Sequence, residues 1–351
     1  MSGRFKKASG DFPPAEACLE MALGERLWQD LTESSGSQWW SRLQGVNQQL
    51  LSAYGLPLPG LRLDRQADLD ANAYRFRLAG GPWEGGLLYP GRWFATGDPE
   101  TVSLLMGEMG QEPVYGLEGR WIPDSRAQGA QALGCHLLAA EALWVGHLCD
   151  RVESRLNLCL DEDWLRRRLK HLGLKSPGAS FIQVLRQLLE ERVGIGPLKL
   201  IAEAYRGCAG DCSRRLKAVR QALGARLVSP WLNEHGELIC LTLAQSASSR
   251  LRQELARPGG PEQWFLGLLL GQLQAELEWA MQEHHHVALL VPAGVRREIF
   301  ELLPFELRRV PVLSFDEIGP DTAVESLGEV GSRLHPLAGV WPRARVLVNG
   351  M

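Results

Sequence analysis

The stretch that decides the fold begins at Tyr89-Pro90-Gly91-Arg92-Trp93-Phe94-Ala95 and runs to Leu148. Its middle part is Glu112-Pro113-Val114-Tyr115-Gly116-Leu117, followed by Trp121-Ile122. Its last part is Gly134-Cys135-His136-Leu137-Leu138-Ala139-Ala140-Glu141-Ala142-Leu143-Trp144-Val145-Gly146-His147-Leu148. Pro90-Gly91 suits the centre of a type II turn, where glycine takes a positive φ. None of these pieces is a catalytic signature, so their order along the chain carries the information.

The composition is that of a cytosolic globular protein with several packed units. The chain has 351 residues, of which 45% are hydrophobic, and a formal net charge of −3. This length predicts two to four units. The charge argues against a nucleic-acid binder. No apolar run reaches the ~20 residues that span a bilayer. Arg4, Lys6 and Lys7 have no apolar core behind them, so the N-terminus is not a signal peptide.

Cysteine and tryptophan usage adds two expectations. The seven cysteines are odd in number and scattered among apolar neighbours, which is typical of reduced thiols that act as small hydrophobic side chains. The twelve tryptophans suggest large packing surfaces, some of them at subunit or partner contacts.

The first half of the chain predicts short strands between helices. Residues 1–17 mix Gly, Ser, Lys and Pro and are expected to form a linker. A strand and a short helix follow, and then a helix from Ser37 with apolar residues at helical spacing. Alternating polarity predicts strands over 61–64 and 74–78. A module over 97–137 then holds a loop, the Trp121-Ile122 strand, a helix from Ser125 and a strand at Leu137-Leu138.

Helices dominate the centre, and a β-α-β pattern closes the chain. Residues 139–158 predict one helix, and everything from 161 to 223 is helical, with Phe181, Val184, Leu185, Leu188 and Leu189 on one face. Strands are expected over 238–243, 287–291 and 310–313, with helices over 261–280 and 295–303. This order predicts a two-layer unit with buried strands. The Pro-rich end, 332–351, is expected to be a tail.

Two clusters could bind metal. His284-His285-His286 are consecutive, so their side chains point in different directions, and a polar helix-to-strand junction explains them better than a zinc site. Cys208-Ala209-Gly210-Asp211-Cys212 lacks a second pair at metal-site spacing, and is interpreted as structural thiols in a helix-turn-helix. We therefore predict no metal and no cofactor.

Three further motifs have simple structural explanations. A glycine-rich motif occurs at Gly194-Ile195-Gly196-Pro197-Leu198-Lys199. It lacks the four-residue spacing between the glycines and the Lys-Ser/Thr ending of a phosphate-binding loop, and it follows a helix, so we do not expect it to bind a nucleotide. Asp161-Glu162-Asp163 suits a helix start, where negative charge meets the helix dipole. Arg166-Arg167-Arg168 is expected to form a solvated helix face. No Gly-x-Ser-x-Gly elbow supports a nucleophile, so we predict no catalytic residue.

Taken in order from about Cys18 to Val330, the motifs resemble the cytosolic domain of the type III secretion export gate, the FHIPEP family of the flagellar FlhA and the virulence LcrD/InvA/SctV proteins. Tyr89-Pro90-Gly91-Arg92-Trp93 is similar to the family's Tyr-Pro-Gly-Arg-Trp almost letter for letter. Residues 112–117 resemble its Asp-Pro-Ala-Phe-Gly-Leu. Further similarities are Tyr74-Arg75-Phe76, Trp121-Ile122, and the segments 218–224, 289–291 and 312–318.

The resemblance implies a mixed α/β, multidomain fold of four subdomains. The first, α/β, comprises 18–96 and 138–159. The second is inserted over 97–137. The third, 160–224, is helical, and the fourth, 225–331, is α/β. The third is expected to be short between Trp164 and Phe181.

The resemblance also implies partners. The family forms a ring of nine copies beneath the bacterial inner membrane, where it receives export chaperone–substrate complexes and contacts gatekeeper and ATPase-complex proteins. The family's chaperone site, an apolar dimple between the first two subdomains, maps to Glu112, Tyr115, Leu117, Leu138, Leu143 and Gly146. In this interpretation Tyr115 is a surface anchor, Leu138 and Leu143 are an apolar wall or simply core, and Glu112 is a charge at the rim.

Several departures qualify the resemblance. Gly146 replaces a threonine, so a hydroxyl contact with flagellar chaperones is lost, and Gly196-Pro197 stands where relatives carry Arg-Asp. The family's membrane half is missing. We expect a non-enzymatic docking platform of the virulence branch, on the cytoplasmic face of the inner membrane. The alternatives are a cytosolic hydrolase or metal-dependent enzyme, and an adaptor that uses this fold outside secretion.

Overall fold

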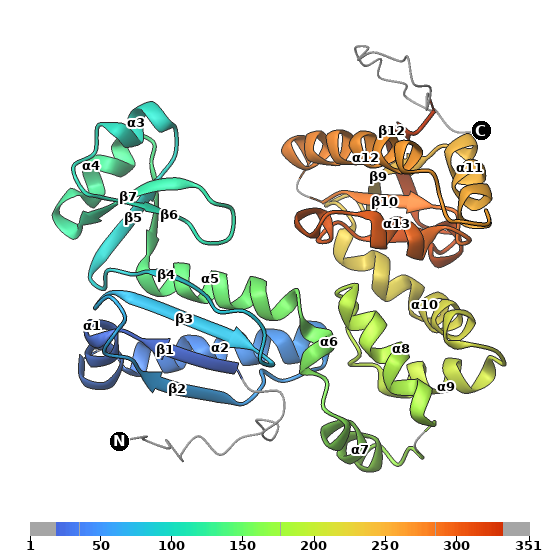
Figure 1. Ribbon diagram of the computed structural model, residues 1–351, viewed down its shortest axis with the longest axis horizontal. Coiled ribbons are helices and arrows are strands. Elements are labelled where there is room, and N and C mark those ends of the chain that lie inside the picture. Colours follow the sequence, from blue (N-terminus) through green and yellow to red (C-terminus); the bar gives the residue numbers. More distant parts are fainter. Residues whose placement is uncertain (1–18, 35, 176, 285, 333–351) are drawn as a thin grey trace. The chain divides into compact units, whose positions relative to one another are not determined.

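The computed structural model describes residues 19–34, 36–175, 177–284 and 286–332. The chain divides into two compact units, 1–198 and 199–351, and each is described here by itself. The predicted linker, 1–17, and all but the first residue of the predicted tail, 332–351, lie outside the described residues. The fold is mixed α/β, and the described residues form three four-stranded sheets. Figure 1 shows their strands among the helices.

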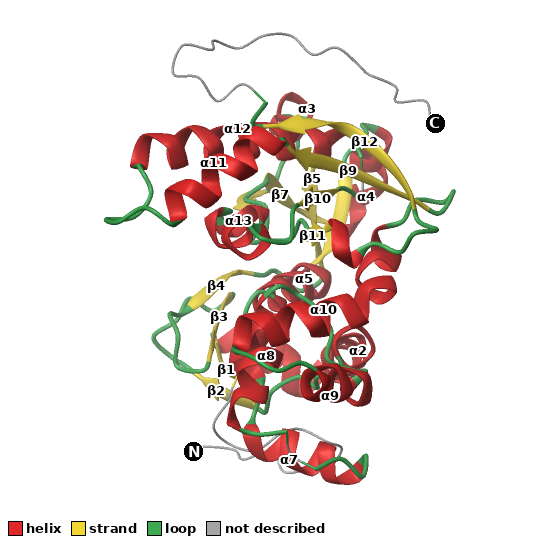
Figure 2. Cartoon of the chain, turned by 90° about the vertical axis from the view of Figure 1, so that its right-hand side faces the viewer, coloured by secondary structure: helices red, strands yellow, loops and turns green. Residues whose placement is uncertain are grey.

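Sheet A opens the first unit, with the strand order β2-β1-β3-β4. Strand β1 pairs parallel with β2 and antiparallel with β3, and β3 pairs antiparallel with β4. Figure 2 shows these strands side by side, with β4 at one edge. The bounds of these elements are β1 Leu19–Leu23, α1 Glu25–Gln29, the π-helix η1 Asp30–Ser34, α2 Gly36–Tyr54, β2 Leu61–Arg65, β3 Ala73–Leu78 and β4 Glu84–Leu87.

Helices α2 and α5 (Ala140–Glu153) pack beside each other against sheet A. The indoles of Trp39 and Trp144 meet edge to face, with ring centroids 4.8 Å apart. The ring of His147 on α5 lies 4.8 Å from that of Phe76 on β3. Aromatic pairs of this geometry stabilise a core beyond their buried area, so α5 is fixed on the sheet.

Sheet B follows, in the order β6-β7-β5-β8, and all its pairings are antiparallel. Its small core joins Ala95, Val102, Ile122, Ala130 and Cys135. The Pro90-Gly91 turn is confirmed, since Gly91 has a φ of 75° and the Arg92 amide donates to the Tyr89 carbonyl. The bounds are β5 Arg92–Thr96, α3 Pro99–Ser103, β6 Glu108–Gln111, β7 Glu118–Pro123, η2 Asp124–Arg126, α4 Ala127–Ala132 and β8 His136–Ala139.

Short helices complete the first unit and lead into the second. They are α6 Leu156–Cys159, α7 Glu162–His171, α8 Ala179–Glu190 and α9 Leu198–Gly207. The predicted face of α8 is confirmed, because Phe181, Val184, Leu185, Leu188 and Leu189 are all buried. Asp161 caps α7 by accepting from the amides of Asp163 and Trp164, as its place at a helix start predicts.

The second unit is built on sheet C, a wholly parallel sheet in the order β11-β10-β9-β12. Helices α11, α12 and α13 share one core with Leu241, Leu289 and Val291. Neighbouring residues that point the other way, such as Cys240 and Leu290, are also buried. The bounds are α10 Cys212–Val228, η3 Ser229–Trp231, β9 Glu237–Leu243, α11 Gln245–Leu255, α12 Gln263–Glu283, β10 Ala288–Val291, α13 Arg296–Leu302, η4 Phe305–Leu307, β11 Val312–Ser314, η5 Phe315–Glu317 and β12 Ala323–Val330.

A buried ionic cluster ties α10 to the end of β11. The guanidinium of Arg220 donates to both carboxylate oxygens of Glu317, at 2.7 and 2.9 Å, and to the Val312 carbonyl at 3.2 Å. Glu317 also accepts from the Ser314 amide, and Arg296 lies 3.8 Å away. These charges are buried together, so each one depends on the others for its stability.

Two expectations about elements need correction. The helix expected over 139–158 breaks at Ser154–Arg155, where Arg155 leaves the helical region (φ −132°, ψ 25°) and pairs with Glu84 at 2.7 Å. The loop expected at the start of the 97–137 module contains regular structure, because residues 97–110 include α3 and the start of β6. Strands β5 and β8 pair within sheet B. The division into four subdomains stays a prediction.

The glycines of the Gly194-Ile195-Gly196 motif allow two segments to approach closely. A Cβ on Gly194 would lie 2.3 Å from the Ala53 carbonyl oxygen, and one on Gly55 (φ 69°) would lie 2.3 Å from the Gly196 Cα. The Ile195 amide donates to the Tyr54 carbonyl at 2.8 Å. Backbone contact of this kind requires glycine. The motif therefore joins the end of α2 to the segment after α8.

Candidate functional site

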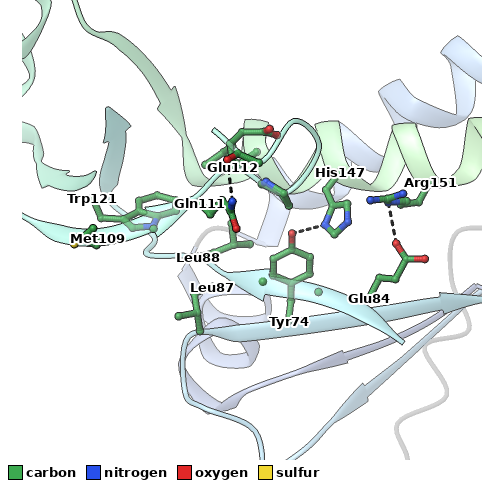
Figure 3. A pocket seen from close by; sticks show the side chains of 16 residues that line it. Tyr74, Glu84, Leu87, Leu88, Met109, Gln111, Glu112, Trp121, His147 and Arg151 are labelled. Atoms are coloured by element: carbon green, nitrogen blue, oxygen red, sulfur yellow. Dashed lines mark hydrogen bonds and ion pairs between the residues drawn. The ribbon is translucent and has the colours of Figure 1, made fainter. Parts of the chain in front are cut away.

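A cavity of ≈ 490 Å³ opens in the first unit between sheet A and sheet B (Figure 3). Four elements form its walls: β4 at the edge of sheet A, β6 at the edge of sheet B, β7, and the inner face of α5. The 112–116 turn forms a further wall. Its lining residues are Tyr74, Glu84, Gly85, Gly86, Leu87, Leu88, Met109, Gly110, Gln111, Glu112, Pro113, Gly116, Trp121, Leu143, His147 and Arg151.

The lining is apolar on the side of sheet B. Met109 and Leu87 come from the two edge strands and are 71% and 49% exposed. Trp121 and Leu143 also line the cavity and are buried. Exposed apolar side chains that adjoin a hollow with a buried apolar floor are typical of protein contact sites.

A buried aromatic pair forms the floor beside β3. The Tyr74 hydroxyl lies 2.7 Å from Nδ1 of His147, and Figure 3 shows the two side chains pointing at each other. Burial, followed by the charge of Arg151, lowers the pKa of His147 to about 4. Burial, followed by the charge of Glu112, raises the pKa of Tyr74. Both groups are therefore neutral at physiological pH, and the floor presents hydrogen-bonding groups without charge.

An ion-pair network borders the floor. Glu84 on β4 forms ion pairs with Arg151 at 2.8 Å and with Arg155 at 2.7 Å. All three side chains are about a quarter exposed or less. The network ties edge strand β4 to α5 and its end, and so holds this side of the cavity in place.

The 112–117 turn is held by its own hydrogen bonds. The Glu112 carboxylate accepts from the amides of Val114 (3.0 Å) and Tyr115 (2.6 Å), and the Glu112 amide donates to the Leu117 carbonyl. Gly116 has a φ of 69°, a conformation that favours glycine. The turn thus presents Tyr115 and Leu117, which are 63% and 50% exposed, on a fixed backbone.

The predicted site residues fall into two groups. Glu112 and Leu143 line the cavity, and Tyr115 lies between the lining residues Pro113 and Gly116. The exposure of Tyr115 and Leu117 agrees with a surface contact. The expectation that Glu112 is a rim charge is wrong: the side chain is buried, and its carboxylate binds the turn.

Leu138 and Gly146 do not line the cavity. Leu138 is half-buried on β8, opposite Phe94, at the other edge of sheet B from β6. Gly146 is exposed on α5, and a Cβ there would meet no atom within 4 Å.

Sequence reasoning did not assign Met109, Leu87, Tyr74 or His147 to the site. Tyr74 and His147 are 73 residues apart, and no local pattern joins them. One available signal was Gly85-Gly86. A Cβ on Gly85 would lie 2.1 Å from the Tyr74 carbonyl oxygen, so this pair marks a close backbone approach beside the cavity.

The other sequence candidates have structural settings. His284 ends α12 and β10 begins at Ala288, which confirms the helix-to-strand junction, while His285 lies outside the described residues. Cys208 lies in the connection between α9 and α10, Cys212 is the first residue of α10, and neither forms a disulfide. Arg166, Arg167 and Arg168 are exposed on α7. Among the residues that the model describes, no group of three His, Cys, Asp or Glu side chains could hold a metal ion.

Relatives of similar sequence are flagellar biosynthesis proteins. The chain is 25% identical over 328 residues to FlhA of Yersinia enterocolitica, covering 89% of this chain and 47% of that protein. It is 25% identical to FlhA of Salmonella typhimurium, covering 91% and 48%. The chain thus spans about half the length of the curated relatives it matches. No helix in the described part of the chain has the length and apolar content needed to cross a bilayer.

Solved structures share the fold. The CdsV protein of Chlamydia pneumoniae superposes with a TM-score of 0.74 at 15% identity, over 92% of this chain and all of that chain. A nonameric EPEC SctV-C gives 0.66 at 16%, over 91% and 100%. CdsV in complex with CdsO gives 0.73 at 15%, over 91% and 99%. At these identities the similarity establishes the fold. The family model described as the FHIPEP family matches residues 13–323, and the chain therefore belongs to the FHIPEP family.

Proposed function

We propose that this chain is the cytosolic docking platform of a type III secretion export gate, and that its cavity receives export chaperones loaded with their substrates. The observation that supports this most is the cavity between sheets A and B, with Met109, Leu87 and Tyr115 exposed around it. In this proposal the chain performs no bond chemistry, and works on the cytoplasmic face of the bacterial inner membrane.

The site has the physical properties of a protein-binding hot spot. Tyr115 offers a large, half-polar ring on a turn that is fixed by the Glu112 carboxylate, so little conformational entropy is lost when a partner covers it. Met109 adds a flexible apolar side chain that adapts to different partners. A surface of this kind suits a platform that receives several chaperone–substrate complexes.

We also propose that the chain assembles into a ring of nine copies and contacts components of the ATPase complex and gatekeepers. Two findings on similar proteins support the proposed ring and the proposed contact with the ATPase complex. The EPEC SctV-C structure is nonameric, and CdsV was solved in a complex with CdsO. Light scattering of the purified chain over a range of concentrations measures its assembly.

The docking proposal is tested by titrating the chain with a cognate chaperone–substrate complex. Met109→Glu places a charge at the apolar rim of the cavity and should weaken binding by at least about tenfold, the effect of losing a hot-spot contact. Leu104→Glu is the matched control, because Leu104 is 75% exposed on the same module and does not line the cavity. Equal binding by both variants would contradict the proposal.

A further inference from the structure

Strand β4 leaves one edge of sheet A open beside the cavity. Among the described residues, β4 pairs with β3 on one side and with no strand on the other. Its exposed residues, Gly85 and Leu87, both line the cavity. An open strand edge presents backbone N–H and C=O groups that can pair with an extended segment of another chain.

The register of the β3–β4 pair identifies the backbone groups that point outward. The Leu88 amide donates to the Asn72 carbonyl at 2.9 Å and continues the β3–β4 register. Alternate residues of an antiparallel strand direct both backbone groups to the same neighbour, so Gly86 bonds to β3, whereas Gly85 and Leu87 face away from it. The part of the chain that the structure describes offers these outward N–H and C=O groups no backbone partner.

The open edge of β4 lacks the features that usually protect a strand edge. Such features include lysine, proline and β-bulges, and β4 contains neither residue and pairs with β3 in regular register. Gly85 and Gly86 leave its backbone without side chains. Figure 3 shows the carboxylate of Glu84 directed at Arg151, with which it forms an ion pair. The edge is therefore both accessible and held in place, which lowers the entropy cost of binding.

Strand β6, on the other side of the cavity, is the edge strand of sheet B but is less accessible. The Glu112 amide donates to the Leu117 carbonyl in the register of the β6–β7 pair, so the outward residues of β6 are Met109 and Gln111. Both carry long side chains, and the Gln111 amide group donates to the Gly116 carbonyl at 2.9 Å. The bare backbone of β4 is the better edge for an incoming strand.

We propose that an extended segment of the docked chaperone–substrate complex adds to the outer edge of β4 as a fifth strand of sheet A. This inference rests on the proposed function and names the element of the partner that the cavity receives. The segment bonds through its backbone to Gly85 and Leu87. Its side chains alternate between solvent and the α5 side of the cavity, where Leu143 is buried, so apolar residues at every second position fit best.

This mode of binding matches the task of the proposed platform. In strand addition the affinity comes largely from main-chain hydrogen bonds, which every sequence can form, and the side chains adjust the specificity. A single edge can therefore receive extended segments from several different complexes. Segments that are not folded before docking are the partners that such an edge selects.

The first test is residue-resolved hydrogen–deuterium exchange of the full chain with and without a cognate chaperone–substrate complex. The amides of Gly85 and Leu87 should exchange about tenfold more slowly in the complex, as expected from one or two net hydrogen bonds, while that of Gly86 changes less. Equal slowing of all three amides, or of none, would overturn the proposal. Slowing at Met109 and Gln111 alone would assign the segment to β6 and also overturn it.

The second test separates the backbone bond from the side chain. Leu87→Pro removes an outward N–H and keeps the bonds between β4 and β3, and Leu87→Ala removes the same side chain but keeps the N–H. The proline variant should bind the complex about tenfold more weakly than the alanine variant. Equal affinities would overturn the proposal. Thermal unfolding checks that both variants are folded, and if the proline variant is not, the exchange measurement on the wild type decides.

Met109→Glu distinguishes a failure of this inference from a failure of the proposed function. If Met109→Glu weakens binding while Gly85 and Leu87 remain unprotected in the wild-type complex, the complex docks at the cavity without adding a strand, and only this inference is overturned. If Met109→Glu binds normally and no amide at the cavity is protected, the proposed function is overturned together with it.

Discussion

Strand β10 of sheet C and strand β4 of sheet A differ in how much of each strand reaches the surface. In sheet C all four residues of β10, Ala288 to Val291, are buried, and helices share their core. Strand β4 of sheet A, Glu84 to Leu87, alternates between half-buried and exposed and borders the cavity. A strand buried on both faces contributes mainly to stability, whereas an open edge beside a hollow is free to bind.

The polar groups of the two units differ in the same way. In the second unit Arg220, Glu317 and Arg296 are buried together, and Glu317 is the carboxylate that both arginines approach. In the first unit Tyr74 and His147 are neutral and line a cavity that opens to solvent. The comparison predicts that substitutions in sheet C alter folding, and that substitutions around the cavity alter binding.

The largest expected effect is that of Glu317→Ala. It leaves Arg220 and Arg296 buried without their carboxylate and should cost about 3–5 kcal/mol of the free energy of unfolding of the second unit. Hydrogen exchange of the β9 and β10 amides measures this loss. Glu306→Ala, at an exposed glutamate of the same unit, should change it by no more than about 0.5 kcal/mol. An equal loss of unfolding free energy in both variants would contradict the claim that the buried ionic cluster stabilises the second unit.

A smaller effect is expected from pH at the cavity floor. Below its ordinary pKa of 6.5, His147 binds a proton in the unfolded chain, but in the folded chain only below about 4. The stability of the first unit should therefore fall as pH drops from about 6.5 to about 4, and stay level below that. His147→Gln should remove about 2 kcal/mol of this dependence, which urea unfolding at pH 7 and pH 4.5 measures. Parallel pH profiles of wild type and variant would show that the floor is more solvated than the geometry indicates.

The smallest effect on stability is expected at the turn. Tyr115→Asp charges an exposed ring and should change the free energy of unfolding by no more than about 0.5 kcal/mol, while it weakens binding of a chaperone–substrate complex. Thermal unfolding and a binding titration of the same preparation separate the two effects. If the variant unfolds instead, Tyr115 supports the core, and the comparison between binding and folding surfaces fails at this residue.

Elements with strong local signals could be predicted from the sequence. The apolar run at β10, the periodic face of α8 and the Pro90-Gly91 turn each depend on residues within a few positions of one another. The break after α5 could not be predicted, because no glycine or proline marks it and Arg155 pairs with a residue on β4. Tertiary contacts override local propensity at such places.

The candidate site could be predicted only in part, because some of its residues are brought together by tertiary contacts. The motif at 112–117 identified Tyr115, whose exposure follows from a turn held by local hydrogen bonds. The prediction that Glu112 is a rim charge was wrong. Its carboxylate accepts hydrogen bonds from the amides of Val114 and Tyr115, and the residue type alone does not distinguish such a carboxylate from one that is exposed to water. Met109 and Leu87 join the cavity because two edge strands from different sheets meet there, and no sequence pattern pairs these sheets.

Hydrogen–deuterium exchange of the chain with and without a cognate chaperone–substrate complex tests the central claim most directly. The account predicts that the complex slows exchange of the amides in β4 and in residues 109–117, which border the cavity, and leaves those of β9 and β10 unchanged. Unchanged exchange at both cavity segments, with slowing confined to other parts of the chain, would contradict it.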